Sequence, residues 1–170
     1  MSRDTTPFSA DGFEQIILSV QRRAEMLEKT QFGKGLEWSE ILSLAGFMEA
    51  YSIAAESVIC RQGETAAFLS IVCRGRVDII KEDLGHKPKI IASVGPGNSL
   101  GEMSLIDGEP RSATARAHAP VELLVLTSDG FEKLADEYPR LWGKLVIRIA
   151  CILSQRLRRT SGVLAEYLES

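Results

Sequence analysis

The chain has 170 residues, of which 45% are hydrophobic and 25% are charged, and its formal net charge is −3. This composition is typical of a single folded globular domain with a full core. The acidic balance argues against a general nucleic-acid binder, although a local basic face remains compatible with it.

The cysteines and the hydrophobic segments indicate a cellular compartment. Cys60, Cys73 and Cys151 are odd in number and widely spaced, so they predict neither a disulfide framework nor a zinc site. No segment approaches the roughly 18 apolar residues of a membrane span, and the N-terminus lacks the basic and apolar regions of a secretory signal. We therefore expect a cytoplasmic protein that does not contact a membrane.

The first 35 residues predict a helical segment. Asp11 and Glu14 resemble a capping box, and apolar residues then recur every three or four positions, as in an amphipathic helix. These apolar residues are Phe13, Ile17, Val20, Ala24 and Leu27. A shorter helix is expected from Trp38 to Leu44, after the breaker run FGKG. Helices are thus expected to precede the first strand.

Between Glu56 and Leu126 the pattern changes to short runs rich in valine and isoleucine. The runs are SVICR, FLSIVC, RVDIIK, KIIASV, SATARA and VELLVL, and residues typical of turns separate them. Because no long helix intervenes, the runs favour an antiparallel sandwich or barrel-like roll over a parallel sheet.

Helical periodicity returns after the last of these runs. Residues 127–129 offer caps for a helix that reaches about Tyr138, and Pro139 suits the first turn of a longer helix towards Tyr167, with Gly162 as a potential interruption. The expected fold class is α+β, an antiparallel, jelly-roll-like β-roll flanked by N-terminal and C-terminal helices. We divide the chain into an N-terminal helical segment (1–35), the roll with its C-terminal helices (36–160) and a tail (161–170).

A small roll commonly holds either a metal or an organic ligand. A metal site of the cupin type needs several histidines and a carboxylate on neighbouring strands. This chain has only His86 and His118, which we expect at turns or on strand surfaces. The sequence therefore predicts no metal and no cofactor, and it favours an organic ligand.

The stretch GPGNSLGEMSLIDGEPRSATARA, from Gly95 to Ala117, is the candidate ligand site. Its glycine spacing matches neither a dinucleotide-binding fingerprint nor a P-loop. A helical turn after Gly101 would point its free N–H groups at one spot. We expect Pro110 to stop that turn and Arg111 to begin a strand, with a guanidinium that suits phosphate.

Glu102 restricts the ligand further, because a carboxylate beside a phosphate site repels the phosphate unless it faces a hydroxyl donor. A ribose with a cyclic phosphate carries both groups. The segment GEMSLIDGEPRSATARA resembles the phosphate-binding cassette of cyclic-nucleotide-binding domains, as in the catabolite activator protein and the regulatory subunits of cyclic-AMP-dependent protein kinase. Gly63 in RQGE and Gly75 in CRGRV also match the family, and the resemblance covers about Leu36 to Arg158.

The resemblance implies a role for each cassette residue. Glu102 would accept a hydrogen bond from the ribose 2′-hydroxyl, and Arg111 would pair with the cyclic phosphate. The backbone N–H groups near Met103 and Ala113 would complete the cradle. The remaining positions are Gly101, which would permit close approach, and Ser112, which would contact phosphate or base. Leu100 departs from the family pattern, in which many members have an aromatic residue there.

The resemblance implies a non-enzymatic sensor of cyclic AMP, or less favourably cyclic GMP, that transmits binding through its C-terminal helices to an unknown effector protein. Taken singly, Arg111 and Glu102 also fit a surface ion pair and a helix N-terminal carboxylate. The alternative is an interaction scaffold of the same fold that no longer senses nucleotide. An enzyme ranks third, because no activated nucleophile or carboxylate pair stands out.

The C-terminal helix carries the prediction about oligomeric state. Its apolar residues Trp142, Val146, Ile149, Leu153 and Leu157 predict a homodimer through this helix, and the alternative is that they pack on the chain's own roll. The resemblance ends near Arg158, and the roughly ten residues beyond it are too few for a helix-turn-helix, so we expect no direct DNA binding. The tetrapeptide RRTS at 158–161 resembles a kinase site but equally fits a solvated helix end.

Overall fold

Two antiparallel sheets form the roll in the computed structural model, which describes residues 12–82 and 87–168. One sheet has the strand order β1-β2-β9-β4-β7 and the other has the order β3-β8-β5-β6. The strands are β1 (Phe13–Ile16), β2 (Glu49–Ile53), β3 (Val58–Cys60), β4 (Phe68–Arg74), β5 (Val77–Glu82), β6 (Pro88–Val94), β7 (Ser99–Leu100), β8 (Thr114–Ala117) and β9 (Val121–Thr127).

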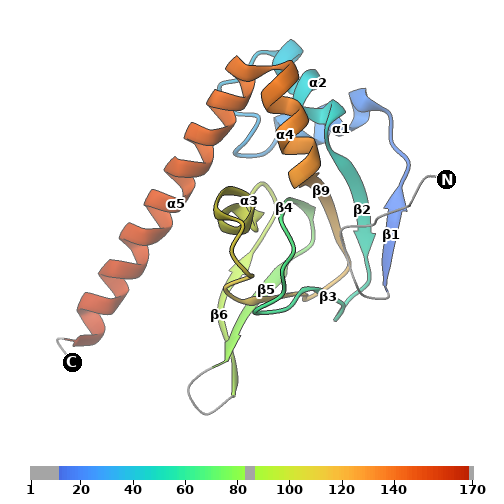
Figure 1. The fold of residues 1–170 in the computed structure, drawn as a ribbon. Helices are drawn as coiled ribbons and strands as arrows, with labels where there is room; N and C mark the ends of the chain where they lie inside the picture. Colours follow the sequence, from blue (N-terminus) through green and yellow to red (C-terminus); the bar gives the residue numbers. More distant parts are fainter. Residues whose placement is uncertain (1–11, 83–86, 169–170) are drawn as a thin grey trace.

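Helices lie at both ends of the chain and within the candidate site. They are α1 (Val20–Glu28), α2 (Trp38–Gly46), α3 (Glu102–Asp107), α4 (Ser128–Glu137) and α5 (Pro139–Leu168). Helices α1, α2, α4 and the start of α5 gather at one end of the roll, and the rest of α5 extends away from them (Figure 1). The expected β-roll with N-terminal and C-terminal helices is confirmed.

All six predicted β-rich runs contain a strand, and a helix begins at Trp38 as expected, but the expected start of the first helix near Asp11 was wrong. The first element is β1, which pairs with β2 from Phe13 opposite Ile53 to Ile16 opposite Ala50. The helix begins only after Ser19, whose hydroxyl oxygen accepts a hydrogen bond from the Arg22 N–H. The apolar spacing was misleading because Ile17 is 96% exposed.

Two other short strands were not predicted from the sequence. The segment EAYSI of β2 contains alanine and serine, which have weak strand propensity, and β7 has only two residues. Both are strands because neighbours pair with them: β2 lies beside β9, and β7 lies beside β4. Their assignment therefore depends on tertiary pairing.

The C-terminal helices agree with the sequence. The Thr127 hydroxyl oxygen accepts a hydrogen bond from the Gly130 N–H at 3.1 Å and caps α4. Pro139 is the first residue of α5, where its missing N–H costs nothing. Helix α5 continues through Gly162 to Leu168, so this glycine does not interrupt it.

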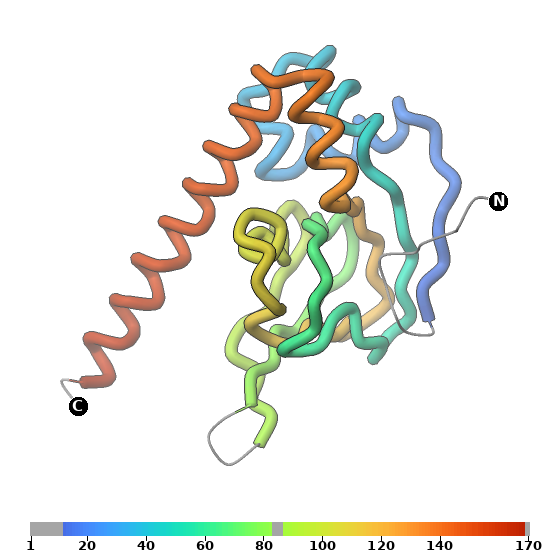
Figure 2. Tube along the Cα trace, viewed as in Figure 1, coloured from blue at the N-terminus to red at the C-terminus, as the bar shows by residue number. Residues whose placement is uncertain are grey.

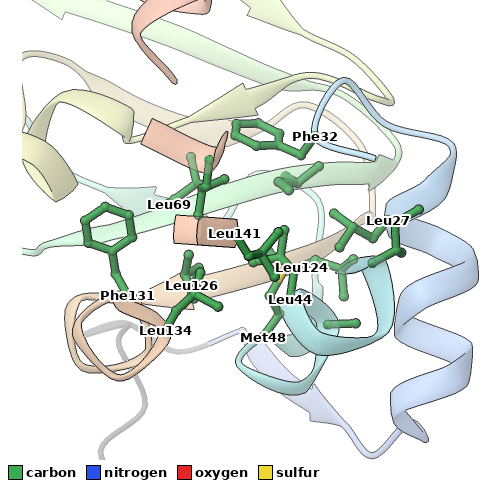
Figure 3. Close-up of a cluster of buried hydrophobic side chains, with 14 of the residues drawn as sticks. Leu27, Phe32, Leu44, Met48, Leu69, Leu124, Leu126, Phe131, Leu134 and Leu141 are labelled. Carbon is green, nitrogen blue, oxygen red and sulfur yellow. The ribbon is translucent and has the colours of Figure 1, made fainter. Parts of the chain in front are cut away.

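The core has two parts, separated by the five-stranded sheet. Strand β4 alternates between them: Leu69 and Ile71 face the helices, whereas Phe68 and Val72 face the interior of the roll. Figure 3 shows the helix-side cluster, in which Leu27 from α1 and Leu44 from α2 pack with Leu124 and Leu126 of β9. The predicted division at residues 35 and 36 stays a prediction, and residues from both sides of it share this cluster.

The stripe predicted to pair two copies of the chain instead serves this core. Ile149 is 1% exposed within the helix-side cluster, and Trp142, Val146 and Leu153 pack against the same cluster. Only Leu157 of the stripe is largely exposed, at 68%. The choice of stripe was therefore wrong, because four of its five residues belong to the helix-side cluster or pack against it.

The expected surface position of the histidines can be checked for one of them. His118 is exposed after β8, and its Nδ1 lies 2.9 Å from a carboxylate oxygen of Asp78. The other Asp78 oxygen accepts a hydrogen bond from the Ser93 hydroxyl at 2.7 Å, which lowers the pKa of Asp78. His86 lies outside the described residues.

Candidate functional site

The cassette is built on β7, α3 and the loop before β8. Gly101 follows β7 with a left-handed backbone (φ 86°), and α3 then forms one short helix, as predicted. The helix ends at Gly108, whose N–H donates to the Ser104 carbonyl at 3.1 Å. The expected stop at Pro110 was therefore wrong, because a left-handed glycine already ends the helix two residues earlier.

Arg111 lies in the loop three residues before β8, and not in the strand as expected. Its backbone is held by the turn that contains RQGE. The Arg111 N–H donates to the Glu64 carbonyl at 2.9 Å, and the Arg111 carbonyl accepts from the Gly63 N–H at 2.8 Å. This pair of hydrogen bonds fixes where the Arg111 side chain leaves the backbone.

The Arg111 side chain is turned inward, and the residue is only 4% exposed. Its Nη2 donates to the Phe68 carbonyl at 2.8 Å, and the centre of the guanidinium lies 4.1 Å from the centroid of the Phe68 ring. Nε and Nη1 are buried and have no hydrogen-bond partner among the residues that the structure describes. Burial lowers the pKa of Arg111, an effect that Cys60, Glu64 and Glu102 oppose.

A buried cation with two unsatisfied donors is costly, because it has lost water without gaining acceptors. An anionic oxygen placed against Nε and Nη1 would supply the missing acceptors. Burial thus excludes the alternative in which Arg111 forms a surface ion pair, and the anion site at Arg111 stays a prediction.

Gly101 is required by packing against Arg111. A Cβ at this position would lie 2.1 Å from Arg111 Nη1 and 2.4 Å from the Phe68 carbonyl oxygen. Both distances are far shorter than any real carbon contact, so the site admits only glycine here. The close approach that Gly101 permits in this structure is that of the guanidinium itself.

Glu102, the first residue of α3, is 1% exposed. One carboxylate oxygen accepts a hydrogen bond from the Ser99 hydroxyl, and the other lies 2.8 Å from Nη1 of Arg156. Arg156 also donates from Nη2 to the Ser99 carbonyl at 2.5 Å. The buried charge of Glu102 is thus paired, whereas that of Arg111 has no carboxylate partner among the described residues.

The sequence prediction missed Ser99 and Arg156. Arg156 is distant in sequence and comes from α5, but it continues the inward spacing of the buried residues Leu145, Ile149 and Ile152. An arginine at a position that continues a buried apolar pattern indicates a charge that faces inward, and the sequence alone contains this pattern. Ser99 had no such signal, because its role depends on the position of α3.

The other predicted residues flank this centre. Met103 is half-exposed on α3, and Ser112 and Ala113 form the bend between Arg111 and β8. The departure from the family pattern, Leu100, is buried in the interior of the roll. The structure thus brings together Gly101, Glu102 and Arg111, with the remaining cassette residues at their edge.

A known protein family matches the part of the chain that holds this arrangement. The family model described as "Cyclic nucleotide-binding domain" matches residues 51–138, just over half of the chain, and this range includes the whole cassette. The chain belongs to the cyclic nucleotide-binding domain family. The family membership and the antiparallel roll that the sequence predicts are both confirmed.

Several known proteins are similar to this cyclic nucleotide-binding domain. A cyclic nucleotide-gated potassium channel from Rhizobium etli is 38% identical over 52% of this chain and 23% of its own length. The cyclic AMP receptor protein of Thermus thermophilus is 36% identical over 57% of this chain and 43% of its own length. The chain therefore matches less than half of each of these relatives.

A solved structure agrees over most of the fold. A cyclic nucleotide-binding domain from Methylobacillus flagellatus has a TM-score of 0.82 and 26% identity, and the match covers 92% of this chain and 89% of that one. Within residues 12–82 and 87–168, no helix is long and apolar enough to cross a membrane. The same described residues contain no cluster of histidine, cysteine and carboxylate side chains that would hold a metal ion.

Proposed function

We propose that this domain is a sensor that binds cyclic AMP, with weaker affinity for cyclic GMP, and performs no catalytic step. The observation that carries this proposal is the buried Arg111 guanidinium with two donors that lack a partner in the described structure. A cyclic phosphate supplies acidic oxygens for those donors, and a planar guanidinium matches their geometry.

The other cassette residues take the roles that the family resemblance implies. Glu102 accepts a hydrogen bond from the ribose 2′-hydroxyl, because each of its oxygens keeps a lone pair beyond the bond that it already makes. The N–H groups near Met103 and Ala113 complete the phosphate cradle, and Gly101 keeps Arg111 in place. Ser112 is exposed beside Arg111, where its hydroxyl can reach phosphate or base.

The preference for cyclic AMP is supported by one relative, which is named a cyclic AMP receptor protein. Calorimetric titration with cyclic AMP, cyclic GMP and 5′-AMP tests the proposal directly. We expect the tightest binding for cyclic AMP and the weakest for 5′-AMP. A clear preference for cyclic GMP would reverse the base assignment alone. If neither cyclic nucleotide bound, the result would favour the interaction scaffold, in which an acidic group of a partner protein lies against Arg111.

Glu102→Gln should weaken cyclic AMP binding more than binding of 2′-deoxy cyclic AMP. The substitution keeps the size of the side chain but replaces the charged acceptor that faces the ribose hydroxyl, and a hydrogen bond to a charged group is worth roughly 1.5–3 kcal/mol. Parallel calorimetric titrations of both ligands measure the difference. Equal losses for the two ligands would move Glu102 away from the ribose.

We further propose that α5 transmits binding and pairs two copies of the chain through a stripe that the core leaves free. This stripe has alternating spacings of three and four, the pattern of a coiled-coil seam, and all of its residues are exposed. Its members are Ile147, Ala150, Ser154, Leu157, Ser161, Leu164 and Leu168. In Figures 1 and 2 the C-terminal part of α5 extends beyond the other helices, where a second copy has access.

Leu157→Glu should therefore convert a homodimer to a monomer. Light scattering of the unchanged chain should give twice the 18.7 kDa chain mass, and the variant should give the mass of one chain because it places a charge in the seam. The control is Gln155→Glu, which adds the same charge at an exposed position outside the stripe. An unchanged chain with the mass of one chain at micromolar concentration, with and without cyclic AMP, would refute the dimer.

The compartment and the effector complete the proposal. Cys60, Cys73 and Cys151 are all free thiols, and burial raises the pKa of Cys73 to about 11. Free thiols fit a reducing compartment such as the cytoplasm. The effector is a protein that contacts α5 or the dimer that α5 forms.

A further inference from the structure

The segment between α1 and α2 lies beside the first half of α5 (Figure 2), and a hollow of about 370 Å³ is present where the two meet. The hollow is lined by residues from 32–36 and from 144–151, all of which lie outside the cassette. Its volume is within the range of roughly 300–1,000 Å³ that is typical of small-molecule pockets. The hollow is therefore a candidate ligand site separate from the cassette.

Apolar side chains form much of the lining. Phe32 and Leu145 are almost fully buried, and Leu36 is half-buried beside them. Ile147 also lines the hollow, but 66% of this residue is exposed. Covering such a side chain removes apolar surface from water, which is favourable. The lining therefore favours a ligand with a hydrocarbon body.

The polar part of the lining is cationic. Lys34, Lys144 and Arg148 all line the hollow, and no carboxylate does so within the described part of the chain. Lys144 is compensated by Glu40, whose carboxylate oxygen lies 2.6 Å from its Nζ. Lys34 and Arg148 have no acidic partner among residues 12–82 and 87–168. An anionic head group would therefore meet two uncompensated positive charges.

Hydrogen bonds hold the wall of the hollow in place without a ligand. Nη2 of Arg148 donates to the Lys34 carbonyl at 2.6 Å, and the Leu36 N–H donates to the Gly33 carbonyl at 3.2 Å. Arg148 thus fixes the segment with one nitrogen, and no described residue accepts from its other N–H groups. A site that is already ordered binds a ligand with a smaller entropic cost.

We propose that this hollow binds a small carboxylate with an apolar body, of the class of medium-chain fatty acids. The carboxylate lies against Arg148 and Lys34, and the hydrocarbon chain covers Ile147 and Leu145. A planar guanidinium with free N–H groups matches the geometry of a carboxylate. The inference depends neither on the cassette nor on nucleotide binding.

Cys151 provides a reporter of occupancy, because its exposed thiol lines the hollow. Octanoate should slow the alkylation of Cys151 by iodoacetamide several-fold in the full chain. Peptide mass spectrometry measures this rate, and Cys60 and Cys73 serve as internal controls that should not change. Octan-1-ol and octylammonium have the same hydrocarbon chain without the negative charge, so they should protect Cys151 much less.

Calorimetric titration with octanoate measures the affinity. Hexanoate should bind several-fold more weakly than octanoate, because it buries two fewer methylene groups. Arg148→Gln should weaken octanoate binding about tenfold through the loss of a charge-assisted hydrogen bond. The matched control is Arg140→Gln, which removes an exposed arginine of the same helix outside the hollow.

Lys34→Gln separates charge recognition from a disturbed wall. Arg148 contacts the backbone carbonyl of Lys34, so this substitution removes the charge and keeps the hydrogen bond that holds the segment. It should weaken octanoate binding a few-fold, and circular dichroism should show an unchanged fold. Unchanged affinity in both Lys34→Gln and Arg148→Gln would overturn the proposal.

The reporter distinguishes the other occupants. Alkylation of Cys151 that octanoate does not slow, or that octan-1-ol and octylammonium slow equally, would overturn the proposed carboxylate. Ile147 also begins the free stripe of α5, so a second copy of the chain is the competing occupant. Protection of Cys151 that rises with chain concentration in the absence of octanoate would assign the hollow to that second copy and overturn the small ligand.

Discussion

Replacing Arg111 with alanine should weaken cyclic AMP binding at least about tenfold. Losing even one charge-assisted hydrogen bond costs roughly 1.5–3 kcal/mol, and two donors of the guanidinium have no partner within residues 12–82 and 87–168. The fold should survive, because the substitution also removes a buried charge that is costly without its ligand. Calorimetry measures the affinity, and circular dichroism checks the fold.

Thermal unfolding gives a second measure of the same loss. Ligand at about 100 times its dissociation constant should add roughly 2.7 kcal/mol of stability to the unchanged chain, and the gain at that concentration should shrink markedly in Arg111→Ala. Arg76→Ala serves as the control, since this exposed arginine follows the far end of β4 from Phe68. An unchanged affinity in a folded Arg111→Ala chain would remove the cassette assignment.

Gly101→Ala should both destabilise the fold and abolish ligand binding. The added Cβ meets the Arg111 guanidinium and the Phe68 carbonyl, and neither can move freely because they are hydrogen-bonded to each other. Adopting the left-handed backbone costs a non-glycine residue roughly 1–2 kcal/mol in addition. Denaturant unfolding measures the stability, and calorimetry with cyclic AMP measures the binding.

Gly108→Ala separates the cost of the left-handed backbone from the cost of the steric clash at Gly101. Gly108 has a similar left-handed backbone (φ 70°), but a Cβ there meets nothing within 4 Å. The control should therefore lose only the backbone strain energy and keep its affinity for cyclic AMP. If the two variants lost equal stability and both retained binding, the contact between Gly101 and Arg111 would not matter to the site.

The strand runs and the cassette were predictable because their signals are local. Each of the six runs is rich in β-branched residues and is bounded by turn residues, and the sequence GEMSLIDGEPRSATARA carries the family resemblance within one short segment. The N-terminal helix was predicted too early because apolar spacing does not show whether a partner strand is available. Strand β2 provides that partner for residues 13–16.

The apolar stripe of α5 shows the same limit. Spacing alone cannot say which of two apolar faces meets the core, and the structure assigns Ile149 to the core and Leu157 to the surface. The free stripe from Ile147 to Leu168 contains alanine and serine, so its hydrophobic pattern is weaker than that of the buried one. The more hydrophobic of the two patterns is therefore the face of α5 that packs in the core.

By itself the sequence determined the order of most elements and the residues Gly101, Glu102 and Arg111, because short-range propensity, turn chemistry and a compact motif suffice for these. Only the tertiary structure decided that Arg111 is buried with two donors that no described residue satisfies, and that Arg156, 54 positions after Glu102, reaches its carboxylate from α5. Such pairings depend on where separate elements pack, and burial then sets the cost of a charge that lacks a partner.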